Sequence, residues 1–373
     1  MATQRSRRLV EALLATAGIR INGGNPWDIR VHDERFFARV LADGSLGAGE
    51  AYMDNWWDCP RLDEFFFRLL RHNIEDQVRT GRQMLYQNVL SRIGNPQHIA
   101  RAFRSTRQHY DLGNDLFRAM LDSRMMYSCA YWKDADTLEE AQEKKLDLTC
   151  RKSQLQPGMH VLDVGCGWGG FAKFAAERYR VKVTGITLSE QQATLARNVC
   201  EGWPVDIRLQ DYRTLRGTFD RIVSIGMFEH VGPNNYRTFM TRMAALLKDD
   251  GLFLLHSIGA NVSSYATDAW LERYIFPGSV LPSVSQIGKA IEGLFVMEDW
   301  HSFGAYYDRT LMAWHNNFIA NGEKLKTSYD DRFFRMWTYY LLSCAGSFRA
   351  RKNQLWQIVL SKRGSPAGYE SYR

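Results

Sequence analysis

The chain has 373 residues, of which 45% are apolar, 13% aromatic and 24% charged. This composition is sufficient for packed cores in about two domains, and it excludes a wholly disordered chain. Because no run of about 18 apolar residues occurs, the composition also argues against a membrane-spanning helix.

The cysteines and the N-terminus indicate a cytoplasmic protein. The six cysteines are scattered without a C-x-x-C pair, which predicts free thiols and neither a disulfide framework nor a metal site. The segment Leu9–Ile21 follows arginines, but it contains Glu11 and lacks a small-residue cleavage site. We therefore expect an amphipathic helix there and not a signal peptide.

The first part of the chain predicts a separate domain. Residues 1–93 are rich in aromatic side chains and mostly helical in pattern, so we expect a small N-terminal domain whose bulky apolar groups form mainly its own core and partly a lipid-facing or interdomain surface. Residues 94–108 open with Gly-Asn-Pro and are expected to form a linker. The remainder, residues 109–373, is expected to be the catalytic domain.

Positive charge is concentrated between Arg68 and Arg107. The net charge of the chain is +7, and this stretch holds eight arginines against Glu75 and Asp76. A basic stretch with interleaved apolar residues suits nucleic acid or an anionic membrane surface, and it is equally compatible with a solvated linker. Charge alone does not choose among these.

From Met159 onward, strands and helices alternate. This spacing predicts an α/β fold with a doubly wound, mostly parallel sheet. Strands are expected at His160–Val164, Val181–Thr187, Val205–Leu209, Phe219–Ile225, Gly251–His256, Phe295–Trp300 and Leu355–Leu360. Helices are expected near Gly169–Arg178, Ser189–Glu201, Asn235–Leu247, Thr310–Ala320 and Arg332–Phe348.

The segment Asp163–Gly170 reads DVGCGWGG and joins the first of these strands to a helix. Glycines allow close approach of the backbone to a ligand, and a helix start offers free N–H groups to an anion. The spacing fits a dinucleotide motif, S-adenosylmethionine (SAM) or a structural turn. Asp163 before the first glycine, and the absence of an acidic residue where a nicotinamide ribose would need one, favour SAM.

Polar side chains follow two of the predicted strands. Glu229 and His230 come after the fourth strand, and His256 closes the fifth. Ligands of open α/β sheets bind beyond the carboxyl ends of the strands, so Glu229 and His256 are candidates for acid–base chemistry. A lone His230 beside a carboxylate is more often a cap or core residue, and Cys344 in an apolar helix is more often packing.

Several strings resemble the bacterial cyclopropane-fatty-acyl-phospholipid synthases. They are HYDLGNDLF from His109, MYSCAYW from Met126, LDVGCGWGG from Leu162, MFEHVG from Met227, LLH from Leu254 and FPG from Phe276. The similarity covers nearly the whole chain, including GAGEAYMD from Gly47. The mycolic-acid methyltransferases share the catalytic part but generally lack this N-terminal domain.

The resemblance implies a class I SAM-dependent methyltransferase that converts the cis double bond of a phospholipid acyl chain into a cyclopropane ring. The methyl of SAM is transferred to give a carbocation, and a bicarbonate ion accepts the proton whose loss closes the ring. The family also implies a homodimer, peripherally bound to the inner face of an anionic membrane, with no nucleic acid partner and no metal.

The resemblance assigns residues to two sites. The bicarbonate contacts fall on Cys129, Glu229, His256, the backbone of Ile258, and Tyr307. The SAM contacts fall on Tyr127, Ser128, Asp163, Gly165, Cys166, Gly167, Gly169, Gly170, Thr187, Leu188, Gln192, Asp211 and Tyr212. Cys344 matches a cysteine proposed as a covalent nucleophile, although its apolar setting argues against a thiolate.

Other functions remain open at this point. A related enzyme could stop before ring closure and leave a methyl-branched chain. The basic stretch could instead mark an RNA methyltransferase, although no RNA-binding module is evident. A SAM-binding membrane protein without catalysis is disfavoured by the intact set of polar residues.

Overall fold

The computed structural model describes residues 2–74, 113–364 and 366–373. The predicted linker at 94–108, most of the Arg68–Arg107 stretch and the start of the HYDLGNDLF string lie outside the described residues. Among those that are described, no helix combines the length and the apolar character needed to cross a bilayer.

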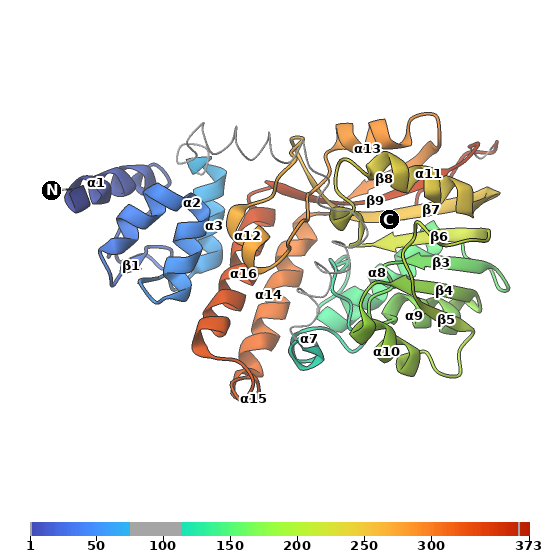
Figure 1. The fold of residues 1–373 in the computed structure, drawn as a ribbon, viewed down its shortest axis with the longest axis horizontal. Coiled ribbons are helices and arrows are strands. Elements are labelled where there is room, and N and C mark those ends of the chain that lie inside the picture. Colours follow the sequence, from blue (N-terminus) through green and yellow to red (C-terminus); the bar gives the residue numbers. More distant parts are fainter. Residues whose placement is uncertain (1, 75–112, 365) are drawn as a thin grey trace. The chain divides into compact units, whose positions relative to one another are not determined.

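The chain divides into two compact units (Figure 1). The helical unit comprises the described part of Met1–Gly94 together with Ala266–Pro277 and Tyr307–Asn353. The sheet unit comprises the described part of Asn95–Tyr265 together with Gly278–Tyr306 and Gln354–Arg373. The segments Ala266–Pro277 and Tyr307–Asn353, which the sequence analysis assigned to the 109–373 catalytic domain, are thus grouped with the N-terminal helices. The division into a lipid-docking and a catalytic domain stays a prediction.

The helical unit is formed by helices from both ends of the chain. Its elements are α1 (Ala2–Ala15), β1 (Arg30–Val31), α2 (Arg35–Met53), β2 (Trp57–Asp58), α3 (Leu62–Arg71), α12 (Ala269–Tyr274), α14 (Ala305–Ala320, from Tyr307 on), α15 (Gly322–Leu325) and α16 (Asp331–Arg349). Close packing of α16 on α3 depends on Gly346, because a Cβ there would lie 2.6 Å from the carbonyl oxygen of Asp63. Aromatic side chains fill the core, including Trp57, Trp270 and Tyr339.

The predicted helix at Leu9–Ile21 is wrong at both ends. The helix α1 begins at Ala2 and ends at Ala15. Gly18 has a φ of +67°, and this left-handed conformation does not continue a helix. Ile21 instead forms an isolated bridge with Ile29. Helices predicted at Thr310–Ala320 and Arg332–Phe348 are confirmed in α14 and α16.

The sheet unit contains seven strands in the order β5-β4-β3-β6-β7-β9-β8. The strands are β3 (His160–Val164), β4 (Lys182–Thr187), β5 (Val205–Leu209), β6 (Phe219–Ile225), β7 (Leu247–Ala260), β8 (Val296–Ser302) and β9 (Asn353–Ser361). Those from β5 to β7 pair in parallel, whereas β8 and β9 pair antiparallel. This arrangement confirms the predicted doubly wound α/β sheet.

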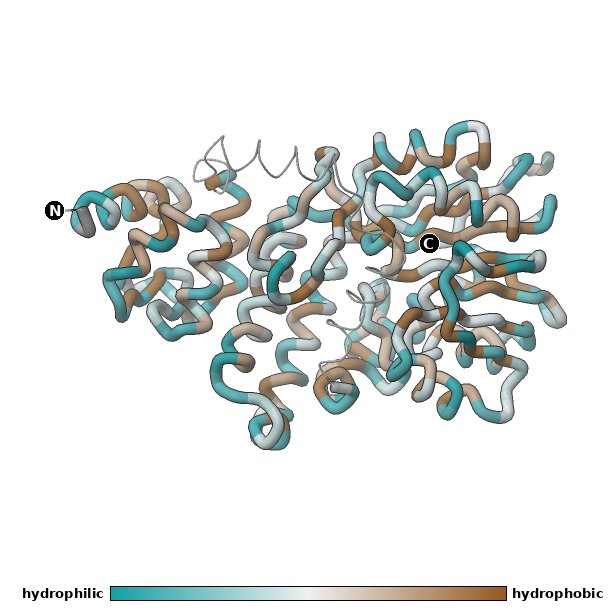
Figure 2. The backbone as a smooth tube through the Cα atoms, in the orientation of Figure 1, coloured by the Kyte–Doolittle hydropathy of each residue, from teal (hydrophilic) through white to brown (hydrophobic). Residues whose placement is uncertain are grey.

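The remaining helices of the sheet unit are α7 (Asn114–Met120), α8 (Leu138–Lys152), α9 (Gly170–Tyr179), α10 (Glu190–Val199), the 3₁₀ turn η1 (Phe228–His230), α11 (Tyr236–Leu246) and α13 (Val284–Ile291). Alternate residues of the central strands point to opposite faces. Leu162 and Val164 pack with α11 and α13, whereas Val161 packs with α8, α9 and α10. Apolar side chains therefore cover both faces of the sheet. Brown segments, which mark hydrophobic residues, recur along these strands in Figure 2.

Candidate functional site

The turn after β3 has the geometry expected of a ligand-binding glycine loop. Gly165 has a φ of +84°, and a Cβ at this position would lie 2.8 Å from the side chain of Met227. At the start of α9, a Cβ on Gly170 would lie 2.3 Å from the carbonyl oxygen of Arg124. Position 165 therefore favours glycine because of its left-handed φ, and position 170 because a side chain there would collide with the backbone of Arg124.

The loop is tied to β4 through hydrogen bonds. The amides of Gly165 and Cys166 both donate to the carbonyl oxygen of Ile186 at 3.0 Å. Gly167 and Gly169 also adopt positive φ angles, and Gly169 caps α9. The Cys166 thiol is buried, which raises its pKa well above the ordinary value and makes it a packing group.

Asp163, at the end of β3, is a buried carboxylate facing the loop. Its Oδ2 atom has no hydrogen-bond partner among the described residues. Burial raises the pKa of Asp163 to about 7, opposed by the nearby Lys145. An unpartnered buried oxygen of this kind is costly unless a ligand supplies a donor.

Lys145 of α8 links the two predicted sites, and the sequence did not single it out. It is fully buried, and its Nζ donates to the hydroxyl of Ser128 at 3.0 Å. Burial lowers its pKa to about 8, while Asp122, Cys129 and Asp163 act in the opposite direction. In the sequence, Lys145 follows Lys144 in a charged helix and resembles a solvated residue, so no signal distinguished it.

The residues predicted after β4 and β5 also lie at the carboxyl ends of their strands. The Thr187 hydroxyl donates to Oε1 of Gln192 at 2.8 Å, and Leu188 lies between Thr187 and the capping residue Ser189. Asp211 accepts bonds from the backbone and guanidinium of Arg213, and Tyr212 packs edge-on against Phe239. These contacts hold in place the side chains of Thr187, Gln192, Asp211 and Tyr212, which the resemblance assigns to SAM.

Glu229 lies in η1, after β6, and is buried. Its Oε1 accepts a bond from the backbone N–H of Ile258 at 2.7 Å, whereas Oε2 has no partner among the described residues. Burial raises the pKa of Glu229 to about 7, although bonds from its own amide, Ile258 and Ser257 oppose that shift. The backbone N–H of Ile258, which the resemblance assigns to the bicarbonate, thus donates its hydrogen bond to Glu229 in this structure.

His256 is buried near the end of β7. Its Nε2 atom has no hydrogen-bond partner among the described residues, whereas Nδ1 lies 3.4 Å from Nε2 of Gln357. Burial, together with Lys145 and Lys152, lowers the pKa of His256 well below its ordinary value. The imidazole is therefore neutral near pH 7.

The neighbouring strand ends connect these groups. The amide of Gly226 donates to the carbonyl oxygen of His256 at 2.9 Å, and β6 pairs with both β3 and β7.

Cys129 is fully buried, and its thiol contacts the carbonyl oxygen of Ala130. For His230, burial lowers the pKa to about 4, in keeping with a packing histidine.

Two predicted residues belong to the helical unit. Tyr307 is buried, and its ring contacts those of Trp314 and Phe348. Cys344 lies in α16, where burial raises the pKa of its thiol to about 12 and Asp268 adds to that rise. A thiol with this pKa is protonated near neutrality, which supports packing over nucleophilic attack.

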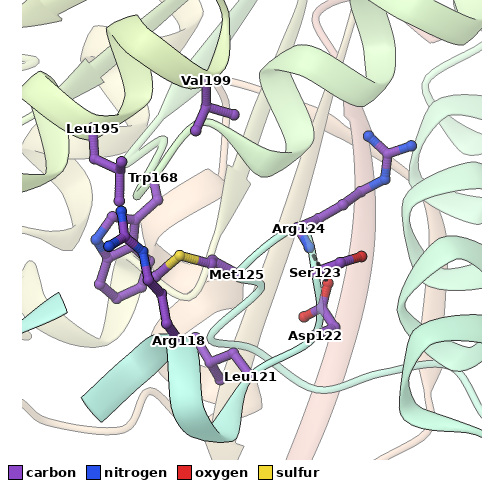
Figure 3. A pocket seen from close by; sticks show the side chains of 9 residues that line it. All are labelled: Arg118, Leu121, Asp122, Ser123, Arg124, Met125, Trp168, Leu195 and Val199. Atoms are coloured by element: carbon purple, nitrogen blue, oxygen red, sulfur yellow. Dashed lines mark hydrogen bonds between the residues drawn. The ribbon is translucent and has the colours of Figure 1, made fainter. Parts of the chain in front are cut away.

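A cavity of about 330 Å³ lies beside the glycine loop in the sheet unit. Figure 3 shows nine of its lining residues, which are Arg118, Leu121, Asp122, Ser123, Arg124, Met125, Trp168, Leu195 and Val199. Asp122 accepts a bond from the amide of Arg124 at 2.9 Å, which holds the segment before Met126. Trp168 of the Asp163–Gly170 loop lines this cavity, whereas the single residues that the resemblance assigns to SAM are not among the lining residues named above.

Comparison with known proteins identifies the family. Residues 97–358 match the family model described as mycolic acid cyclopropane synthetase. The chain belongs to this family. It is 54% identical over 355 residues to the cyclopropane-fatty-acyl-phospholipid synthase of Escherichia coli K12, a match that covers 95% of this chain and 93% of that protein. Its enzymatic class is accordingly that of the SAM-dependent methyltransferases.

Other relatives have the same fold. A probable fatty acid methyltransferase of Pseudomonas putida is 40% identical, and the match covers 68% of both chains. The structure of a cyclopropane synthase from Mycobacterium tuberculosis superposes with a TM-score of 0.66 at 32% identity, covering 70% of this chain and 98% of that one. A mycolic acid cyclopropane synthase in complex with SAH and CTAB gives the same score at 34% identity and the same coverage of both chains. The class I methyltransferase fold is confirmed, and SAM, not a dinucleotide, is the ligand of this family.

Proposed function

We propose that this enzyme converts the cis double bond of unsaturated phospholipid acyl chains into a cyclopropane ring. The observation that carries the proposal is a pair of buried atoms at adjacent strand ends, Glu229 Oε2 and His256 Nε2, neither of which has a hydrogen-bond partner in the part of the chain that the structure describes. The named relatives supply the substrate class, since the Escherichia coli protein is a cyclopropane-fatty-acyl-phospholipid synthase.

The reaction balances with SAM as the only methylene source. An alkene carbon attacks the methyl of SAM, the sulfur–carbon bond breaks, and S-adenosylhomocysteine leaves with the bonding pair. The acyl chain then carries a carbocation. Loss of one proton from the new methyl gives the electron pair that closes the ring.

The polar cluster fits an acid–base anion such as bicarbonate. Bound bicarbonate would supply the base that accepts the proton. Burial raises the pKa of Glu229 to about 7, so its carboxyl is partly protonated at neutral pH and does not simply repel an anion. Within the described ranges, Glu229 Oε2 and His256 Nε2 have no hydrogen-bond partner. Cys129 is close enough to Lys145 to affect its pKa.

The remaining predicted contacts belong to the same proposal. Tyr307 is proposed to add its hydroxyl to this anion site. The Asp163–Gly170 loop, Thr187, Gln192 and Asp211 are proposed to hold SAM. Holding the methyl and the alkene in line at about 3–3.5 Å is the main way to accelerate attack by so weak a nucleophile.

The structure of the lipid product tests whether the enzyme forms a cyclopropane ring. Purified enzyme is incubated with SAM and vesicles of a mono-unsaturated phospholipid, and the extracted lipid is examined by proton NMR. We expect the olefinic signals to disappear and cyclopropane signals to replace them. Retained olefinic signals with a new branch methyl would instead indicate the methyl-branching reaction. No change in the lipid would contradict both readings.

We further propose that the enzyme is cytoplasmic, acts as a homodimer and binds the inner membrane surface through its basic stretch. Each arginine near an anionic surface contributes roughly 1 kcal/mol, an attraction that fades within a Debye length of about 8 Å. Between Arg68 and Arg107 the chain has eight arginines and two acidic residues. Analytical ultracentrifugation measures the oligomeric state.

Vesicle co-sedimentation tests the surface contact. Binding should rise with the fraction of anionic lipid and fall with added salt. Reversing Arg79, Arg82 and Arg92 to Glu should weaken binding while SAM affinity is kept. A triple variant that binds anionic vesicles as tightly as the parent would show that the stretch is a solvated linker.

A further inference from the structure

Gln357 is the one polar residue in the apolar run Leu355–Leu360. It lies in β9, is fully buried, and follows Trp356 and precedes Ile358, which both belong to the hydrophobic core. Burying an amide is unfavourable unless its groups form hydrogen bonds. The strand β9 adjoins β7, which carries His256, so the hydrogen bonds of the Gln357 amide bear on that site.

A chain of hydrogen bonds leads from α8 through Gln357 to His256. The Thr149 hydroxyl donates its proton to the carbonyl oxygen of Lys145 at 2.8 Å. With that proton in use, the oxygen of Thr149 accepts from Nε2 of Gln357 at 3.1 Å. The amide nitrogen, and not the amide oxygen, therefore faces this side of the site.

The same nitrogen faces His256. Nε2 of Gln357 lies 3.4 Å from Nδ1 of the imidazole. Because an amide nitrogen only donates, Nδ1 accepts, and a neutral imidazole must then carry its proton on Nε2. Nε2 is the ring atom that is buried without a partner among the described residues.

We propose that Gln357 is a positioning residue that holds His256 in the Nε2–H tautomer, so that this N–H donates to the bound anion. The inference rests on the proposed function for the nature of the ligand. The tautomer itself follows from the hydrogen-bond chain alone. A donor at Nε2 would bind an acceptor oxygen of bicarbonate, whereas the opposite tautomer would present a lone pair to the anion and repel it.

NMR of enzyme labelled with ¹⁵N-histidine tests the tautomer without lipid or bicarbonate. The spectrum of His256→Ala assigns the signals of His256, and the ¹⁵N shifts show which nitrogen is protonated. We expect protonated Nε2 in the parent, and a shift toward protonated Nδ1 in Gln357→Glu, whose carboxylate accepts from Nδ1. Gln357→Met, which removes the donor while keeping the volume, should give a mixture of tautomers.

Activity provides the second readout. Gln357→Glu should lose at least about tenfold in kcat while its SAM dissociation constant stays within a few-fold. Gln354→Glu makes the same change elsewhere in β9, where the side chain bonds Asn261, and should leave the His256 tautomer unchanged. A parent enzyme with protonated Nδ1, or tautomers unaffected in both Gln357 variants, would overturn the inference. Failure of cyclopropane formation with the predicted tautomer present would instead contradict the proposed function.

Discussion

The two units of this enzyme bury carboxylates in opposite electrostatic settings. In the helical unit, Asp63 lies between Arg61, at 3.0 Å, and Arg349, at 2.9 Å. In the sheet unit, one oxygen of Asp163 and one of Glu229 have no partner among the described residues. Asp63 and Asp163 are equally buried, with 2% of their surface exposed, so burial alone does not separate them.

Their pKa directions follow from these partners. Burial raises the pKa of Asp63, but hydrogen bonds and charges from Arg61 and Arg349 outweigh it and the net shift is downward. For Asp163 and Glu229, burial prevails and the pKa of each rises to about 7. The first carboxylate stabilises the fold, whereas the other two, which we propose to bind ligands, are buried at a cost in stability.

The largest effect is expected for Glu229→Gln. Turnover should fall about 1,000-fold, because the anion site loses a proton-exchanging group, while SAM affinity stays within a few-fold. An activity assay beside calorimetric SAM titration measures both, and His256→Ala and Tyr307→Phe should behave similarly. The exposed Glu201→Gln is the matched control. Full turnover in Glu229→Gln would remove the proposed site.

For the free energy of unfolding, the larger effect is expected in the helical unit, at Asp63, and the smaller one in the sheet unit, at Asp163. Asp63→Asn removes the ion pairs of a buried carboxylate with two partly exposed arginines and should lower the free energy of unfolding by about 2 kcal/mol. Asp163→Asn, in contrast, replaces a carboxyl that is already partly neutral, and its change should stay below about 1 kcal/mol. Urea denaturation of both variants measures the difference. Equal losses would show that the two settings do not differ energetically.

The pH dependence gives a smaller effect. The folded pKa of Glu229 is raised to about 7, so its contribution to stability is fully present below the unfolded value near 4.5 and is lost as pH rises through 7. Between pH 6 and 8, the parent should lose roughly 1 kcal/mol relative to Glu229→Gln. Denaturation of both proteins at the two pH values checks this. Parallel stability curves would mean that Glu229 ionises normally.

The smallest effect is expected for Cys344→Ser. If Cys344 only packs, turnover should stay within about twofold and the free energy of unfolding should fall by about 1 kcal/mol, since a hydroxyl replaces the thiol among apolar groups. Turnover and thermal denaturation are measured together. A folded variant that binds SAM and lipid yet shows no turnover would restore a direct catalytic role.

The sequence predicted the sheet more fully than the site. Strands β3, β5 and β6 match their predicted bounds because turn-forming residues border them, among them Gly165, Pro204 and Gly226. The strand β7 is longer than predicted, since the charged residues 248–250 read as a turn while Leu247 pairs with Phe219. The helix at Leu9–Ile21 was misplaced because its apolar periodicity concealed the left-handed Gly18.

Within the site, sequence identified Glu229 and His256 but not the groups that tune them. Lys145 and Gln357 act through contacts with residues 17 and 101 positions away, and helical periodicity carries no trace of such contacts. The sequence contains one indication of Gln357, because it is the single amide within the apolar run Leu355–Leu360. The engagement of the Ile258 amide by Glu229 depends on a side-chain conformation and could not be read from spacing.

Dependence on bicarbonate tests the central claim most directly. The parent enzyme and Glu229→Gln are assayed in buffer freed of carbon dioxide, and bicarbonate is then added back. We predict that the parent loses at least about tenfold in turnover and regains it with bicarbonate, whereas Glu229→Gln stays slow throughout. Parent turnover that is unchanged by the removal of bicarbonate would contradict an anion held by Glu229 and His256.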